Sequence, residues 1–184
     1  HIDSSKKSSF DSFLRKAFLD RFFKKEDTIN DVETNTLSDA GDFIGAEYQV
    51  ENINRDHNEL SLGVSRNISF LSDKPAVTVK KNYIFKKSSI DVYYKIEGES
   101  DEGIPLLFGT EINLSLASDG RESQRLYVIG GEGRREIGTG KEESEQITEV
   151  EIQDLYNDVV ITLSSTNPFD LWSLPIKTEI LDDN

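Results

Sequence analysis

Apolar and polar residues alternate along most of this sequence, in short runs separated by brief polar links. Successive side chains of a strand point to opposite faces, so each run predicts a strand with one apolar face. The runs follow one another without helical patterns between them, which favours antiparallel pairing over alternating strand–helix units. We therefore expect an all-β fold, an antiparallel two-sheet sandwich. The predicted strands cover residues 42–52, 59–65, 76–85, 89–98, 105–116, 123–130, 147–154, 158–165 and 169–180.

The links between these runs contain turn-forming residues. Residues 53–58 predict a hairpin loop, and residues 86–88 predict a short turn. Residues 26–41 are acidic and predict a loop. Residues 130–145 are rich in glycine and charge, which fits either a long mobile loop or an exposed ribbon. Pro175 implies that the last strand lies at an edge or contains a bulge.

The N-terminal segment has a different pattern. Residues 8–25 place Phe10, Phe13, Phe18 and Phe22 at spacings that describe one face of a helix. We expect this helix to pack on the sandwich through that stripe. The predicted organisation is a helical lead over residues 1–26 and a β-sandwich domain over residues 27–184.

Charge and composition exclude several classes of protein. The chain has 184 residues and a net charge of −14, which disfavours binding to nucleic acid or to anionic membrane surfaces. It contains no cysteine, so disulfides and thiolate metal sites are excluded while the compartment stays open, with the cytoplasm favoured. The absence of methionine and the start at His1 predict a processed chain or a piece of a longer protein.

Catalytic and metal-binding motifs are weak. His1 and His57 are the two histidines, and neither fits a Ser-His-Asp set or a zinc site. The acidic segments 39–42 and 52–59 offer oxygen ligands for a structural Ca²⁺ ion, although a solvated loop explains them as well. The glycines of residues 130–141 lack the spacing of a phosphate-binding loop. We expect no other cofactor.

Glu111 is the carboxylate set most deeply in an apolar strand. It lies with Asn113 on the second face of residues 105–116, after Gly109. Three interpretations remain open: a sugar-binding face, a solvated face with cross-strand Glu–Lys pairs, or a structural pair with Arg or Lys across a domain interface. Glu111 is also the best candidate for an acid catalyst, although no partner carboxylate can be chosen.

The preceding run carries a matching polar set that includes Tyr93 and Lys95. If the two strands are neighbours, these side chains form one surface with Glu111 and Asn113, and Tyr93 can stack against a sugar ring. Trp172 is the single tryptophan; it is a candidate stacking platform or, more often for such a residue, a packing anchor. The candidate carbohydrate-binding residues are Tyr93, Lys95, Glu111, Asn113 and Trp172.

Three stretches together resemble the β-sandwich region that follows the catalytic barrel in family 57 glycoside hydrolases, the α-amylases and 4-α-glucanotransferases. They are SSFDSFL at 8–14, LLFGTEINLSL at 106–116 and LYNDVVITLSSTNPFDLWSLPIKT at 155–178. The matching positions are Phe108, Gly109, Glu111, Asn113, Leu114, Asp158, Leu171, Trp172, Pro175, Ile176 and Thr178.

The resemblance implies a galactose mutarotase-like supersandwich and a role without catalysis. The chain would then be an accessory domain that supports a catalytic barrel of the same polypeptide or binds α-glucan or an oligosaccharide. Two alternatives stay open. One is a stand-alone interaction or assembly domain without sugar binding, and the other is a mutarotase-like enzyme that uses Glu111 with Tyr93.

Overall fold

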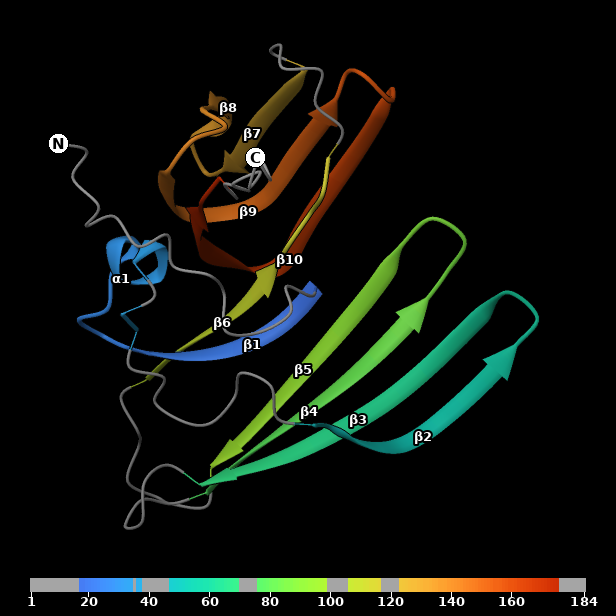
Figure 1. Ribbon diagram of the computed structural model, residues 1–184. Coiled ribbons are helices and arrows are strands. Elements are labelled where there is room, and N and C mark those ends of the chain that lie inside the picture. Colours follow the sequence, from blue (N-terminus) through green and yellow to red (C-terminus); the bar gives the residue numbers. More distant parts are fainter. Residues whose placement is uncertain are drawn as a thin grey trace, which may run out of the picture. The chain divides into compact units, whose positions relative to one another are not determined.

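The computed structural model describes residues 17–34, 36–37, 47–69, 76–98, 106–116 and 123–175. Strands make up nearly all of its regular structure, and every strand pairing is antiparallel (Figure 1). The prediction of an all-β antiparallel fold is therefore confirmed. The chain divides into two compact units, residues 1–113 and residues 114–184, which are described in turn.

The main sheet of unit 1 is a meander of four strands in the order β2-β3-β4-β5. Period-two alternation and short polar links produce this order, because each strand pairs with the next along the chain. The hairpin loop expected over residues 53–58 is shorter than predicted: β2 continues to Asp56, and the turn is His57–Asn58. The strands are β2 (Gln49–Asp56), β3 (Glu59–Ser69), β4 (Ala76–Phe85) and β5 (Ile90–Gly98).

A second layer of unit 1 consists of β1 (Ala17–Lys24) and β6 (Leu106–Ile112), which pair with each other. The predicted helix over residues 8–25 is wrong where the structure describes it, because residues 17–24 form a strand; residues 8–16 lie outside the described ranges. The aromatic stripe also fits a strand with Phe22 on one face and Phe23 on the other. Pairing with β6, which is remote in sequence, selects the strand.

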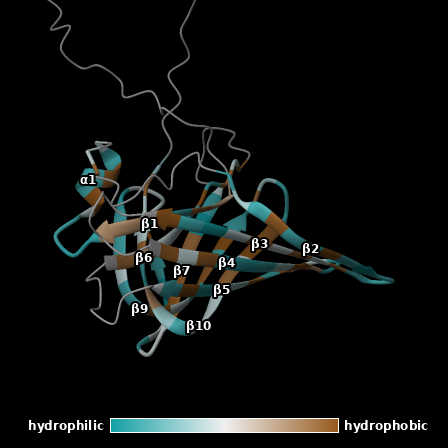
Figure 2. Cartoon of the chain, turned by 90° about the horizontal axis from the view of Figure 1, so that it is seen from below, coloured by the Kyte–Doolittle hydropathy of each residue, from teal (hydrophilic) through white to brown (hydrophobic). Residues whose placement is uncertain are grey.

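The core of unit 1 lies between these two layers. Phe22 of β1 and Phe108 of β6 contact each other, with ring centroids 5.3 Å apart, and pack with Ile68, Val77 and Val79 of the main sheet. Brown and teal alternate along the strands of this sheet in Figure 2, as expected for a sheet with one apolar face.

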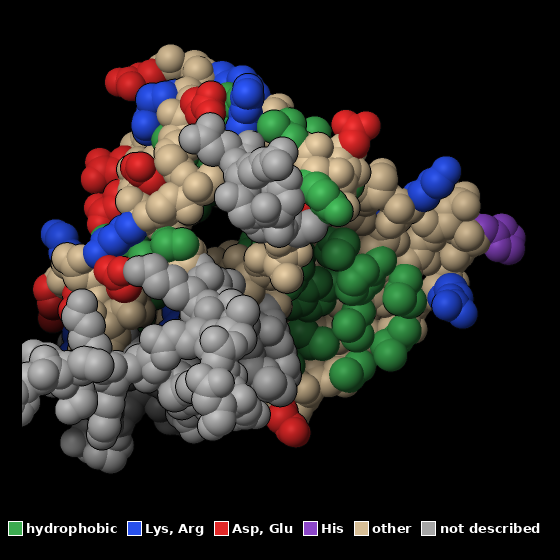
Figure 3. Space-filling model, turned by 45° about the horizontal axis from the view of Figure 1, so that its top comes forward, with side chains coloured by type: hydrophobic (Ala, Val, Ile, Leu, Met, Phe, Trp, Pro, Cys, Tyr) green, Lys and Arg blue, Asp and Glu red, His purple; other side chains and the backbone are tan. Residues whose placement is uncertain are grey.

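The apolar face of the main sheet extends beyond this core toward the hairpin turns. Hydrophobic side chains gather on the sheet near these turns (Figure 3). They are half-buried or exposed, unlike the core residues. The residues of this stretch are Ile53, Leu60, Leu62, Phe85, Ile90 and Val92.

A short helix, α1 (Ile29–Glu33), interrupts the acidic segment that we expected to be a loop. Thr28 precedes it, and the Asp31 carboxylate accepts hydrogen bonds from the Thr28 backbone N–H at 2.9 Å and from the Thr28 hydroxyl at 2.6 Å. These bonds lower the pKa of Asp31 and stabilise the first turn. The Thr-x-x-Asp spacing is a sequence signal for a helix start that the prediction missed.

Unit 2 is a four-stranded sheet in the order β10-β9-β7-β8. Its core contains Leu126, Val128, Ile137, Ile147 and Val150. For the glycine-rich segment 130–145 we expected either a long mobile loop or an exposed ribbon. The structure shows the ribbon, since β8 lies within this segment. β10 joins the predicted strand 158–165 to the first part of the predicted strand 169–180, and it ends at Ser173, before Pro175. The strands are β7 (Gln124–Gly130), β8 (Gly133–Ile137), β9 (Glu142–Asp154) and β10 (Val159–Ser173).

Candidate functional site

The outer face of the main sheet of unit 1 carries a row of polar and aromatic residues. Asn52 of β2 lies opposite Gly63 of β3, Gly63 opposite Asn82 of β4, and Asn82 opposite Tyr93 of β5. Side chains in such a row stand roughly 5 Å from their neighbours. The row therefore places two carboxamides and one phenol ring across the sheet, interrupted by a residue without a side chain.

A shallow depression of about 260 Å³ follows this row. The missing side chain of Gly63 lets the Asn52 carboxamide lie over it: a Cβ atom at Gly63 would stand 2.6 Å from Nδ2 of Asn52. Tyr93 is 59% exposed, so most of its ring is available to a ligand. The Ser61 hydroxyl donates to Oδ1 of Asn82 at 3.1 Å, which fixes the orientation of that carboxamide.

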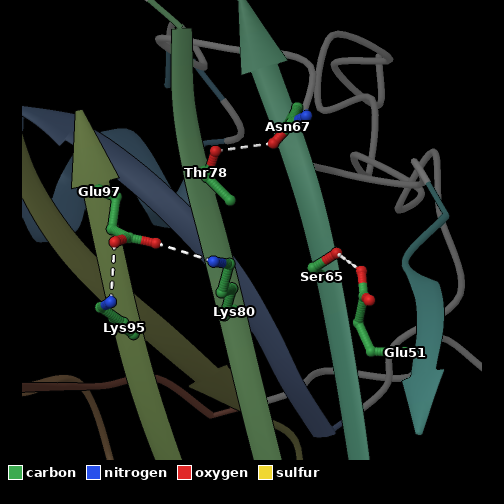
Figure 4. A network of polar contacts seen from close by, with 7 residues as sticks. All are labelled: Glu51, Ser65, Asn67, Thr78, Lys80, Lys95 and Glu97. Carbon is green, nitrogen blue, oxygen red and sulfur yellow. Dashed lines mark hydrogen bonds and ion pairs between the residues drawn. The ribbon is translucent and has the colours of Figure 1, made fainter. Parts of the chain in front are cut away.

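Charged and polar side chains on the same face are held by one another (Figure 4). Glu97 pairs with Lys80 at 3.0 Å and with Lys95 at 2.8 Å, and the hydrogen bonds from Lys95 and Lys80 lower the pKa of Glu97. The Ser65 hydroxyl donates to Glu51, and the Thr78 hydroxyl donates to Asn67 at 2.7 Å. The face thus offers donors and acceptors in fixed positions, with balanced charge around Tyr93 and Lys95. The paired residues Asn67, Thr78, Lys80, Lys95 and Glu97 lie on three neighbouring strands.

Glu111 and Asn113 do not belong to this face. Arg21 of β1 donates to Oε2 of Glu111 at 2.6 Å, and Nδ2 of Asn113 donates to Oε1 at 2.8 Å. This geometry matches the structural interpretation of Glu111, a pair with arginine, except that the arginine belongs to the neighbouring strand within unit 1. Both carboxylate oxygens accept hydrogen bonds, so Glu111 is not poised as a general acid.

The expected common surface of Glu111, Asn113, Tyr93 and Lys95 does not form, because β5 and β6 belong to different sheets. The Tyr94 hydroxyl lies 3.1 Å from the Thr110 hydroxyl, and the ring of Tyr94 contacts Phe108. These side chains meet between the two layers. Their strand neighbours point the opposite way, so Tyr93 and Glu111 lie on opposite outer faces of unit 1.

Trp172 lies in unit 2, on the edge strand β10 opposite Glu143 of β9. It is half-buried, which fits the packing interpretation. Of the candidate residues, the structure therefore brings together Tyr93 and Lys95. Asn52, Asn82 and Lys80 were missed, although the alternation of residues 76–85 placed Lys80 and Asn82 on one face.

A buried ion pair lies between the two layers of unit 1. Nζ of Lys81 lies 2.6 Å from Oδ2 of Asp20, and both side chains are almost completely buried. The ammonium also donates to the Phe18 carbonyl at 2.9 Å, lies 4.5 Å from the centre of the Tyr48 ring, and faces Tyr94 at 5.4 Å. Such a site stabilises a buried cation through hydrogen bonds and cation–π contacts together.

Burial shifts the pKa values of this cluster. It raises the pKa of Tyr83 to about 12 and raises the pKa of Tyr48 further, where the hydrogen bond to Asp20 adds to the effect. It lowers the pKa of Lys81. Oδ1 of Asp20 accepts no hydrogen bond from the described residues. The side chains of Asp20 and Lys81 are almost completely shielded from solvent, so we assign this cluster a structural role.

The described ranges contain neither a cluster of metal-ligating side chains nor a membrane-spanning helix. They contain no group of three or more His, Asp or Glu side chains that could hold a metal ion, and residues 52–59 form strand ends and a turn. Residues 39–42 lie outside these ranges, so the calcium site stays a prediction. No helix in the described part of the chain has the length and apolarity to cross a bilayer.

Comparison with known proteins identifies similar domains. The profile of the family described as "Alpha-amylase/4-alpha-glucanotransferase, C-terminal" matches residues 1–179. The crystal structure of a 4-α-glucanotransferase from Thermococcus litoralis has the same fold, with a TM-score of 0.69 and 22% sequence identity. The match covers 91% of this chain and 23% of that enzyme. A sequence search of curated proteins gave no match.

Proposed function

Since the chain belongs to the C-terminal family of α-amylases and 4-α-glucanotransferases, we propose that it is a non-catalytic accessory domain of an α-glucan-processing enzyme. In this proposal it binds α-glucan through the outer face of β2–β5. The family membership supports the enzyme class, and the Asn52–Gly63–Asn82–Tyr93 row supports the sugar-binding role.

The chemistry of this row suits a neutral sugar. A glucose ring has an apolar face that stacks on an aromatic ring and a rim of hydroxyls that pair with carboxamides. Tyr93 supplies the ring, while Asn52 and Asn82 supply a donor and an acceptor each. The site is open and shallow, so it fits one side of an extended oligosaccharide better than an enclosed monosaccharide.

The same geometry argues against catalysis by this chain. Glu111 is engaged by Arg21 and Asn113 and lies on the opposite side of unit 1 from Tyr93. A mutarotase-like reaction that uses Glu111 with Tyr93 is therefore not supported. Glycoside hydrolysis needs two carboxyl groups that flank one bond, and the depression contains one carboxylate among its lining residues, Glu51.

Titration with maltoheptaose tests the proposal, with the amide and side-chain NMR signals of the chain as the readout. We expect shifts at Tyr93 and at the carboxamides of Asn52 and Asn82. Tyr93→Ala should weaken binding by about fivefold, since stacking of one ring contributes on the order of 1 kcal/mol. Tyr93→Phe keeps the ring and should retain most of the affinity.

The matched control is Tyr156→Ala in unit 2. Tyr156 is 63% exposed, close to the 59% of Tyr93, but it lies outside the proposed site. Equal affinity of Tyr93→Ala and the unchanged chain would contradict this site. Shifts confined to Trp172 and its neighbours would place the sugar on unit 2 instead.

A further inference from the structure

Unit 2 displays a group of apolar side chains at the turn between β9 and β10, which we call the apolar tip. This tip comprises residues 155–160. Four of its six residues are large and apolar, and each is between 45% and 63% exposed. They are Leu155, Tyr156, Val159 and Val160.

Hydrogen bonds to Asp154 and Ser123 fix the backbone of the apolar tip. Asp154 is 3% exposed, and its Oδ1 accepts the backbone N–H groups of Tyr156 at 3.0 Å and Asn157 at 3.1 Å. Its Oδ2 accepts Nδ2 of Asn157 at 2.8 Å. The N–H of Leu155 also donates to the Ser123 carbonyl at 2.7 Å, which ties the turn to the start of β7.

Rigid exposed apolar groups favour binding of another surface. A turn fixed by a buried carboxylate loses little conformational entropy on association, so most of the gain from burying Tyr156 and Val160 is kept. Exposed apolar side chains that are scattered singly need no explanation. Four of them within six residues, two on a preorganised turn and two at the start of β10, are typical of an interface anchor.

The size of the related enzyme identifies the occupant. The chain covers 23% of the similar glucanotransferase, so most of such a polypeptide lies outside it. A second copy of this chain would carry the same net charge of −14 and would be repelled. Resting on the proposed function, we propose that the apolar tip docks into an apolar, basic-rimmed pocket on the catalytic portion of the same polypeptide.

Single cysteines test this docking, because the chain has none of its own. Tyr156→Cys probes the apolar tip, and Tyr93→Cys in unit 1 is the matched control, since the two residues are 63% and 59% exposed. Alkylation is followed by peptide mass spectrometry in the 184-residue chain and in the full-length gene product, without glucan. The Y156C thiol should react about tenfold more slowly in the full-length protein, as expected for a protected site, while Y93C reacts equally in both.

Hydrogen exchange of the unsubstituted proteins provides a second measurement that no cysteine can perturb. Amides of residues 155–160 should exchange more slowly in the full-length protein than in the 184-residue chain. Equal alkylation and equal exchange in the two proteins would overturn the docking. Protection that appears in the 184-residue chain as its concentration rises would overturn it in favour of self-association.

The outcomes also separate this inference from the proposed function. A gene product without a catalytic portion contradicts the proposed function and this inference with it. A free tip in a protein that has a catalytic portion contradicts the docking alone. Loss of glucan binding by Tyr93→Ala tests a different surface and leaves the docking unaffected.

Discussion

The main sheet of unit 1 and the sheet of unit 2 each have four antiparallel strands, but they bury different chemistry. The first covers the ion pair of Asp20 and Lys81 and a set of tyrosines beneath β1 and β6. The core cluster of the second is aliphatic, around Val128 and Val150. The same period-two alternation therefore supports two kinds of core.

The difference teaches how each sheet is specified. Aliphatic contacts have no direction, so the sheet of unit 2 depends on alternation and pairing register. A buried ion pair has both direction and a high cost if it is broken. The ion pair between Asp20 on β1 and Lys81 on β4 therefore favours one placement of β1 and β6 over the main sheet.

The largest expected effect comes from removing one member of the ion pair. Asp20→Ala should lower the free energy of opening of β4 by about 4 kcal/mol, because Lys81 would be left buried without its partner. Native-state hydrogen exchange of the β4 amides measures this quantity. The double variant Asp20→Leu/Lys81→Met should lie much closer to the unchanged chain. Equal losses in the single and double variants would show that packing, not charge, carries the effect.

A smaller loss is expected from a cavity in the aliphatic core. Leu126→Ala should destabilise unit 2 by about 3 kcal/mol. Because Trp172 is the single tryptophan and lies in β10, its fluorescence follows the unfolding of unit 2. Asp20→Ala should leave this transition in place. A shift of the Trp172 transition by Asp20→Ala would break the comparison, since the two cores would then unfold together.

Two glycines sharpen the comparison further. At Gly130 in unit 2, a Cβ atom would lie 2.9 Å from the Gln146 carbonyl oxygen and 3.2 Å from Cα of Ile147. Gly130→Ala should therefore cost about 2 kcal/mol, because backbone must move. Gly63→Ala in unit 1 meets the flexible end of the Asn52 side chain, so thermal unfolding should change little while maltoheptaose affinity falls. Similar losses of stability at both glycines would contradict this reasoning.

The subtlest expected difference appears in alkaline solution. Burial raises the pKa of Tyr83 from 10.0 to about 12 and raises the pKa values of Tyr48 and Tyr94 as well. The unfolded chain loses these protons first, so the stabilisation they give is complete below pH 10 and is lost as the pH rises above it. The pKa of Lys81 is lowered from 10.5, so the folded chain loses this proton before the unfolded chain does. This difference opposes the loss of stability below about pH 10.5 and adds nothing further above it.

Unit 1 should therefore unfold in alkaline solution at a lower pH than unit 2. The hydrogen exchange of β4 reports unit 1, while Trp172 fluorescence reports unit 2. Tyr83→Phe removes one of the titrating groups and should shift the transition of unit 1 to higher pH. An identical midpoint for both probes would argue against separate cores.

The sequence was sufficient for strands with clean alternation and clear boundaries. The range of β4 was predicted as observed, since Pro75 precedes it and charged residues follow Phe85. β1 was missed because aromatic residues near Phe18 and Phe22 satisfy both periods, and β6, the partner that decides between them, lies far along the chain. Nothing local to residues 17–24 contains that information.

The candidate site was predictable in part. The alternation of one strand is enough to place Tyr93 and Lys95 on one face. The short hairpin between β4 and β5 is enough to make Asn82 a neighbour of Tyr93. Glu111 was placed on the wrong surface because chain order suggested that β5 and β6 pair. The sequence contains one signal of the buried ion pair: the alternation of residues 76–85 puts Lys81 on the same face as Val79 and Tyr83. Its partner Asp20 was not readable, because the contact depends on how the two layers pack.

The pairing of β1 with β6 has a mechanical consequence. Ala17 lies opposite Ile112, so the start of β1 and the end of β6 lie about 5 Å apart. Tension between the segment before Ala17 and unit 2 would open this ladder one rung at a time from that end, as a zipper opens. The β1–β6 pair thus joins the first and last described strands of unit 1, and a pull along the chain would load its hydrogen bonds one after another.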